Sequence, residues 1–254
     1  MATRLLILGG TTEARLLAAR LAAIPGYASV LSLAGRTTAP LPQGVPVRTG
    51  GFGGVRGLAA YLAAEGIAAL VLATHPYAAR IALHAGQAAP MAAIPAVALV
   101  RPAWHSVPGD DWRYFPSLDG LVAAIGTVPR RVLVTIGRQE AHAFAAAPQH
   151  HYLFRSIEPI EPRPDLPRAE YLLARGPFNL AGESELMRRH GIERLATKNS
   201  GGSATAAKLH AARALRLPVL MVDRPAPTAL PAVETIDGVL DFLAHHAPPA
   251  ARGA

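Results

Sequence analysis

The chain has 254 residues, of which 51% are hydrophobic, and a formal net charge of +8 from 25 Lys and Arg against 17 Asp and Glu. Its length suits two domains of about a hundred residues each, and the absence of cysteine excludes disulfides, thiolate metal sites and a cysteine nucleophile. Because no apolar run reaches the roughly 20 residues that span a bilayer and no signal-peptide pattern precedes the first strand, we expect a cytoplasmic protein without a membrane partner.

The opening stretch predicts a strand at Leu5–Leu8, a tight glycine turn and a helix from about Thr12 to Ala23. Unpaired N–H groups at a helix N-terminus, next to a turn without side chains, favour binding of a phosphate. The dinucleotide fingerprint G-x-G-x-x-G is incomplete here, because Thr11 and Ala14 replace its second and third glycines. The candidate cofactor-binding residues of this turn are Gly9, Gly10, Thr11, Thr12 and Glu13.

A second strand is predicted at about Ala28 to Leu33. NAD-binding folds usually place an acidic residue near the end of this strand to bind the ribose 2′-hydroxyl. This chain instead has Arg36, Thr37 and Thr38 after the strand, without a carboxylate. Arginine and hydroxyl groups suit a 2′-phosphate, so the pattern favours NADP(H) over NAD(H), although Arg36 is also explained as an ordinary solvated loop charge.

A glycine-rich loop, Gly50 to Gly54, has Phe52 at its centre and precedes a predicted helix. A flat ligand could press into such a loop, so Gly51 and Gly53 are candidate cofactor-binding residues; the alternative is that Phe52 only packs into the core. The apolar run that follows, Ala68 to Ala73, is typical of a buried parallel strand.

That strand delivers Thr74, His75 and Tyr77 to its carboxyl end, where ligands of open α/β sheets bind. Thr74 is a candidate cofactor contact and Tyr77 a candidate substrate contact. His75 is a candidate catalytic residue because imidazole exchanges protons near neutral pH. The alternative is that His75 only caps the following helix and packs on Tyr77.

A further strand, Ala96 to Arg101, lies between two prolines, and the sequence does not decide which sheet it joins. The aromatic segment 102–116 is typical of a packed connection between domains. We therefore predict an N-terminal cofactor-binding domain at 1–101, an interdomain segment at 102–116 and a C-terminal domain at 117–254. The alternation of strands and helices predicts α/β folds with parallel sheets.

The second half repeats the scheme of the first. A strand at Arg131 to Ile136 runs into a glycine turn at Gly137. Near the end, an apolar strand leads to Lys198-Asn199-Ser200-Gly201-Gly202, followed by a helix over about 203–215. This turn is a second candidate anion site, and Lys198 is a candidate catalytic and substrate-binding residue because the chain otherwise almost never uses lysine.

Several separated motifs together resemble the precorrin-6A reductases of cobalamin biosynthesis. They are LGGTTEAR at 8–15, GGFGG at 50–54, THPYA at 74–78, RPxW at 101–104 and TKNSGG at 197–202, followed by Arg224-Pro225. The resemblance covers nearly the whole chain. It implies two Rossmann-like domains with a cleft between them, and NADPH-dependent reduction of one carbon–carbon double bond of precorrin-6A to give precorrin-6B.

The resemblance also implies roles for single residues. The first glycine turn would line the cofactor, and Arg36 with Thr37 would bind its 2′-phosphate. The residues that would approach the substrate are Tyr77, Arg101, Lys198, Asn199, Ser200, Gly201 and Gly202. His75 and Lys198 are the candidate proton donors, with water as a rival. Glu13 is awkward beside a pyrophosphate, so the alternatives for it are capping of the helix, a bond to the ribose or carboxamide of the cofactor, and compensation of the helix dipole.

The implied substrate is a tetrapyrrole rimmed by carboxylates, which suits a chain whose positive charge is almost all arginine. A GC-rich genome would explain the arginine equally well. We expect no nucleic-acid partner, because the basic residues are scattered and aromatics make up only 6%. We also expect no metal and a monomeric protein.

Two alternatives remain open at this point. One is an NADP-dependent reductase of another enone or carbonyl; a short-chain type is disfavoured because no Tyr-x-x-x-Lys pair occurs in a predicted helix. The other is a nucleotide-binding module without turnover.

Overall fold

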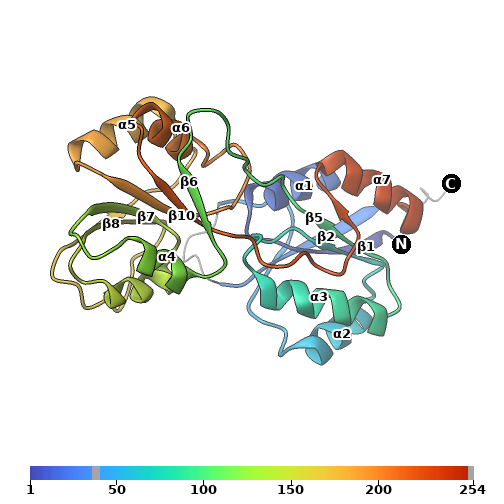
Figure 1. Ribbon diagram of the computed structural model, residues 1–254. Coiled ribbons are helices and arrows are strands. Elements are labelled where there is room, and N and C mark those ends of the chain that lie inside the picture. The colour runs from blue at the N-terminus through green and yellow to red at the C-terminus, as the bar shows by residue number, and fades with distance from the viewer. Residues whose placement is uncertain (36–40, 251–254) are drawn as a thin grey trace. The chain divides into compact units, whose positions relative to one another are not determined.

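The computed structural model describes residues 1–35 and 41–250, and the chain divides into two compact units (Figure 1). Unit 1 comprises residues 1–102 and 225–254, and unit 2 comprises residues 103–224. Each unit contains one six-stranded sheet in which the strand pairs are parallel, with helices on both faces. The predicted α/β class with two Rossmann-like sheets is therefore confirmed.

The sheet of unit 1 has the strand order β12-β5-β4-β1-β2-β3. Its strands are β1 (Thr3–Leu8), β2 (Tyr27–Leu33), β3 (Val47–Thr49), β4 (Ala69–Leu72), β5 (Ala96–Leu99) and β12 (Ala232–Val233). Its helices are α1 (Thr12–Ala22), α2 (Val55–Ala64), α3 (Ala79–Met91) and α7 (Ile236–His246). The strand whose sheet the sequence left open, β5, thus lies between β4 and β12.

The core of unit 1 has two layers because successive side chains of a strand point to opposite faces. Leu5 and Ile7 pack with buried residues of α1 and α7, whereas Leu6 and Leu8 pack with α2 and α3. All four side chains are at most 2% exposed. This burial on both faces is the reason that β1 is a continuous apolar run without alternation.

The sheet of unit 2 has the order β6-β11-β10-β7-β8-β9. Its strands are β6 (Trp112–Phe115), β7 (Arg131–Thr135), β8 (His151–Ser156), β9 (Ala169–Leu173), β10 (Arg194–Lys198) and β11 (Val219–Val222). Its helices are α4 (Leu118–Ala124), α5 (Leu180–Arg189) and α6 (Ala207–Ala214), and the stretch after the glycine turn of β7 is a 3₁₀ helix, η1 (Arg138–Ala146).

The domain boundaries differ from those predicted, because each unit takes its outermost strand from across the chain. β6 follows β5 in sequence but pairs with β11, and β12 follows β11 but pairs with β5. Residues 225–254 therefore belong to unit 1, and the segment 102–116 contains a strand of unit 2. The side chains of α7 explain this assignment, since Val239 and Leu243 are fully buried in the core of unit 1.

The two exchanged segments have the same local design. Ser117 caps α4 by accepting a hydrogen bond from the Gly120 N–H, and Thr235 caps α7 by accepting one from the Gly238 N–H. Both helices begin with an aliphatic residue, Asp and Gly after the cap. Capping by Ser or Thr fixes where each helix starts, so each exchanged segment continues from a strand into a capped helix.

A histidine is fully buried at the start of β8 and predicts acid sensitivity of unit 2. His150 has no exposed surface, and its Nδ1 accepts a hydrogen bond from the Arg130 N–H at 3.2 Å. Burial, followed by the charges of nearby arginines, lowers its pKa, while a hydrogen bond with the backbone of Gly126 opposes this. The native state therefore keeps a neutral ring where the unfolded chain, with a pKa near 6.5, takes up a proton.

We expect the free energy of unfolding to fall as the pH drops below about 6.5, by up to about 1.4 kcal/mol per pH unit from this group. Asn at position 150 keeps an acceptor and does not titrate, so His150→Asn should flatten the pH dependence between pH 7 and 5. Urea unfolding of both proteins at several pH values measures the difference. Parallel curves would contradict the assignment.

Candidate active site

The turn between β1 and α1 leaves space beside the helix N-terminus. Gly10 has a φ of +115°, and a Cβ added to it would meet nothing within 4 Å. Thr11 caps α1: its Oγ1 accepts from the Ala14 N–H at 3.1 Å and donates to the Ala73 carbonyl at 2.8 Å. The first N–H groups of a helix have no partner within it, so this turn fits the phosphates of a dinucleotide.

Gly9 is required for a different reason. A Cβ at this position would lie 2.6 Å from Leu31 Cδ1 and 3.2 Å from the Ala14 Cβ. The missing side chain thus lets the turn pack closely on β2 and α1, whereas the open position beside the turn belongs to Gly10.

Glu13 has a partner that the sequence did not indicate. Its Oε2 accepts a hydrogen bond from Arg101 Nη1 at 3.1 Å, and the two side chains are 28% and 17% exposed. Arg101 follows β5, and β4 lies between β5 and β1 in the sheet. The contact therefore joins the first turn of α1, which follows β1, to the end of a strand that is not adjacent to β1. The carboxylate therefore holds an arginine at the carboxyl edge of the sheet.

The loop Gly50 to Gly54 is held by Arg48, a residue to which the sequence analysis gave no role. The Arg48 guanidinium donates to the carbonyls of Gly50 and Gly51 at 2.7 and 2.6 Å and lies 3.8 Å from the centre of the Phe52 ring. Phe52 itself packs edge-on against Tyr61 and onto the core of unit 1. Phe52 therefore packs into the core, as one of the two interpretations predicted, while the cofactor role of Gly51 and Gly53 stays a prediction.

The segment after β4 brings His75 and Tyr77 together. The His75 Nδ1 accepts from the Tyr77 N–H at 3.3 Å, and the two rings are 5.6 Å apart. Because Nδ1 acts as an acceptor, a neutral ring carries its hydrogen on Nε2. Thr74 is the neighbour of Ala73, whose carbonyl binds the Thr11 hydroxyl, so the ends of β1 and β4 are joined at this edge. Arg36 and Thr37 lie outside the described residues.

The candidate residues of unit 2 centre on an ion pair. Lys198 is the last residue of β10 and only 7% exposed, and its Nζ contacts both carboxylate oxygens of Glu140 from η1. A buried ammonium needs such a partner. Glu140 follows the glycine turn of β7, whose position mirrors the turn of β1, so that repeat was the signal that could have identified it.

Trp104 and Arg224, both from the sequence motifs, hold the loop after Lys198 by hydrogen bonds. Asn199 Oδ1 accepts from the Trp104 N–H at 2.9 Å, and its Nδ2 donates to the Trp104 carbonyl at 3.0 Å. The Trp104 Nε1 donates to the Gly202 carbonyl, and Arg224 donates to the carbonyls of Asn199 and Ser200. The amide of Asn199 thus holds the chain that enters unit 2. Gly201 and Gly202 adopt φ values of +70° and +76°, which favour glycine.

A family model described as precorrin-6x reductase CbiJ/CobK matches residues 4–244. The chain belongs to this family. It is 50% identical over 247 residues to a precorrin-6A reductase of Sinorhizobium sp, covering 97% of this chain and 95% of the relative.

Other members of the family agree in extent. A precorrin-6A reductase of Rhodobacter capsulatus is 47% identical over 244 residues, covering 96% of this chain and 97% of the relative. A solved structure of CobK precorrin-6A reductase superposes with a TM-score of 0.92 at 46% identity, covering 96% of this chain and 97% of that chain. The range that the family model matches, residues 4–244, contains the turn at Gly10 and the turn after Lys198. Among the described residues, no helix is long and apolar enough to cross a bilayer.

Proposed function

We propose that this protein catalyses the NADPH-dependent reduction of one carbon–carbon double bond of precorrin-6A, giving precorrin-6B in cobalamin biosynthesis. The observation that carries the proposal is membership of the precorrin-6x reductase family over residues 4–244. The open turn at Gly10 supports a nicotinamide cofactor, because its backbone has room for a pyrophosphate at the positive end of α1. When bound, NADPH supplies the hydride.

In this proposal the chain's own residues divide the work of binding. The cofactor would be held by Gly9, Gly10, Thr11, Thr12, Gly51, Gly53 and Thr74. Arg36 and Thr37 would bind the 2′-phosphate, on the evidence of their sequence position alone. Glu13 would act by orienting Arg101, with which it pairs, rather than by contacting a phosphate.

The substrate would be held by cationic and polar groups at the carboxyl edges of the two sheets. Tyr77 and Arg101 contribute in unit 1, and Lys198 with the loop to Gly202 contributes in unit 2. Guanidinium and ammonium groups match the carboxylates that rim a tetrapyrrole. The candidate proton donors are Nε2 of His75 and Nζ of Lys198.

The deciding experiment is an anaerobic assay of the purified protein with NADPH and precorrin-6A. We expect NADPH oxidation, followed at its absorbance maximum, together with conversion of the macrocycle to its dihydro product by mass spectrometry. NADH at the same concentration and a reaction without precorrin-6A are the controls. If NADPH binds but neither absorbance nor mass changes, the reductase proposal is wrong and a binding module is favoured.

A second experiment tests the choice of cofactor. Replacing Arg36 by Ala should raise the KM for NADPH by about 10- to 100-fold, because a charge-assisted contact to the 2′-phosphate contributes about 1.5–3 kcal/mol. The KM for NADH should stay the same. Arg20→Ala is the matched control. Arg20 is exposed, lies in the last turn of α1 away from the glycine turn, and pairs with Asp237 of α7. If Arg36→Ala raised the KM for NADPH and for NADH equally, the assignment of Arg36 to the 2′-phosphate would be wrong.

A further inference from the structure

Three basic side chains stand in a row at the amino edge of the sheet of unit 2. Arg131 starts β7 and is paired in register with His151, which starts β8. Tyr152 is paired with Ala169 of β9, which places Arg168 beside His151. Residues paired in register on parallel strands point to the same face of a sheet, and strand spacing is about 4.8 Å, so the row spans about 10 Å.

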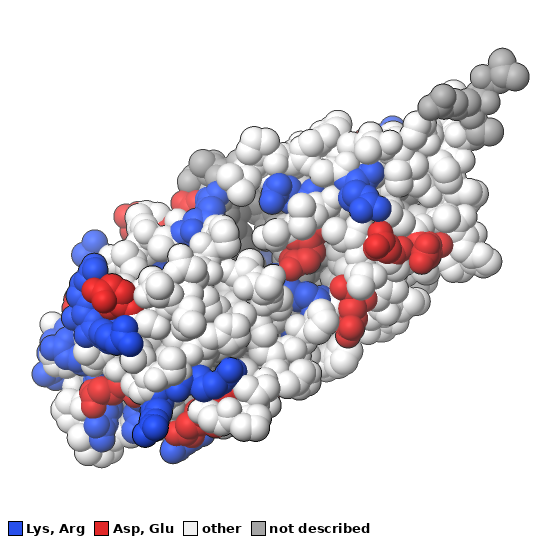
Figure 2. Space-filling view, turned by 90° about the horizontal axis from the view of Figure 1, so that it is seen from above, with Lys and Arg blue, Asp and Glu red and all other residues white. Residues whose placement is uncertain are grey.

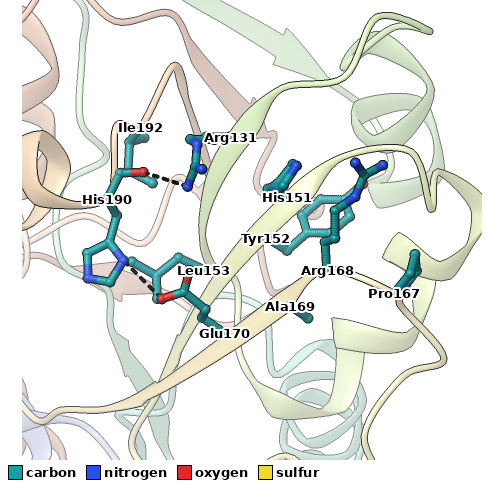
Figure 3. A pocket seen from close by; sticks show the side chains of 10 residues that line it. All are labelled: Arg131, His151, Tyr152, Leu153, Pro167, Arg168, Ala169, Glu170, His190 and Ile192. Carbon is teal, nitrogen blue, oxygen red and sulfur yellow. Dashed lines mark hydrogen bonds and ion pairs between the residues drawn. The ribbon is translucent and has the colours of Figure 1, made fainter.

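This row borders a hollow of about 270 Å³ (Figure 3). Figure 3 shows the labelled side chains of Arg131, His151 and Arg168 among the residues that line it; Arg131 and His151 start β7 and β8, and Arg168 directly precedes β9. The hollow lies at the amino ends of β7, β8 and β9, whereas Lys198 lies at the carboxyl end of β10 in the same sheet. The row therefore belongs to the opposite edge of unit 2 from the candidate active-site residues.

The acidic groups near the row have partners. Glu170 Oε2 lies 3.1 Å from His190 Nδ1. The Glu193 carboxylate accepts from Arg130 Nη1 at 2.8 Å and from the Arg131 backbone N–H at 2.9 Å. These contacts leave the carboxylates engaged with groups other than the Arg131 and Arg168 guanidinium groups.

The two guanidinium groups in turn contact backbone carbonyls. Arg131 Nη1 donates to the His190 carbonyl at 3.4 Å, and Arg168 Nη2 donates to the Gln149 carbonyl at 2.8 Å. A guanidinium group has five N–H donors in a planar fork, so each side chain retains donors for a ligand. Neither contact neutralises the positive charge.

The electrostatic environment of His151 agrees with a local excess of positive charge. Burial, followed by the charges of Arg168 and Arg131, lowers the pKa of its imidazole, while Glu170 opposes the shift. Figure 2 shows Lys and Arg gathered with Asp and Glu over the left side of the view, where unit 2 lies in Figure 1. Net charge alone does not distinguish this surface; the register of two guanidinium groups and an imidazole beside a hollow does.

We propose that Arg131, His151 and Arg168 form a binding site for a small phosphate-class dianion, separate from the candidate active site. Two planar guanidinium forks match phosphate oxygens, and an imidazole between them adds a third donor. Free inorganic phosphate and the terminal phosphate of a small metabolite share this chemistry. The hollow of about 270 Å³ has room for such a group.

The test is an NMR titration of His151 in the full-length protein with inorganic phosphate, and separately with adenosine monophosphate, at constant ionic strength maintained with chloride. The readout is local, so phosphate bound at the turn of Gly10 does not mimic it. We expect saturable shifts of the His151 ring signals and a rise in its pKa on binding, because the dianion favours the imidazolium form. Binding of adenosine monophosphate alone would assign the site to organic phosphates.

Arg168→Ala and Arg131→Ala should each raise the dissociation constant for phosphate at least about tenfold. Arg189→Ala is the matched control because Arg189 is exposed on α5 and pairs with Glu185, and this variant should bind as the unaltered protein does. Far-UV circular dichroism verifies that each variant is folded. The proposal fails if His151 does not respond to either ligand at 20-fold excess over about 1 mM protein, or if Arg189→Ala weakens binding equally. Turnover of precorrin-6A is not part of this test, so the two proposals fail independently.

Discussion

Lys198→Met is expected to lower kcat for precorrin-6A reduction by about 10²- to 10³-fold. Methionine keeps the length and packing of a side chain that is 9% exposed, but it removes the ammonium group. The same change leaves Glu140 without the cation that its two carboxylate oxygens contact. Steady-state kinetics with NADPH held at saturation measure the loss.

Lys198→Arg separates the two roles proposed for this residue. Arginine keeps a positive charge but does not release a proton near neutral pH. If Lys198 only binds a substrate carboxylate, the variant should recover KM and most of kcat; if its Nζ is the proton donor, kcat should stay low while KM recovers. Glu140→Gln should have a smaller effect than Lys198→Met, because the amide still accepts a hydrogen bond. Arg188→Met, on the exposed end of α5, is the control, and a Lys198→Met variant with unaltered kcat and KM would exclude any role in turnover.

Arg155→Met is expected to lower the free energy of unfolding of unit 2 by about 3–5 kcal/mol. Arg155 and Glu183 form an ion pair whose side chains are 5% and 3% exposed. The Arg155 guanidinium also lies 4.0 Å from the centre of the Phe178 ring, which adds a cation–π contact. Removing the cation leaves the Glu183 carboxylate buried without its ionic partner, and this is the source of the large effect.

The double variant Arg155→Met with Glu183→Leu tests that explanation. With both charges replaced by apolar groups, most of the lost stability should return, because the desolvation penalty of the carboxylate is removed. Urea unfolding of the unaltered protein, of each single variant (Arg155→Met and Glu183→Leu) and of the double variant gives the coupling energy between the two residues. A loss below about 1 kcal/mol in the single variant, or no recovery in the double variant, would contradict a dominant role for the buried charge.

Much of the fold followed from local sequence. Leu5–Leu8 predicted a buried strand, and the glycine turns marked where helices begin after it. Such features depend on neighbours a few residues apart, through strand alternation, helix periodicity and caps. The prediction missed the partners of β6 and β12, because the chain order of strands does not fix which edge of which sheet they join.

The site shows the same division. The motifs located the turn at Gly10 and the buried lysine at the end of β10, because both lie directly after apolar strands. Glu140 and Arg48 were given no role, since their contacts depend on loops folding back onto other residues. The substrate role of Asn199 stays a prediction, and the sequence did not indicate that its amide pairs with the backbone of Trp104, 95 residues away in the chain.

By itself, the sequence determined the α/β class, the two glycine turns and the family. Each is encoded in short runs of residues that can be recognised without knowing the contacts between distant segments. Only the tertiary structure decided that Glu13 pairs with Arg101, that the last strand returns to unit 1, and that Arg131, His151 and Arg168 stand side by side. These juxtapositions are set by strand register and core packing between distant segments, which no local pattern specifies.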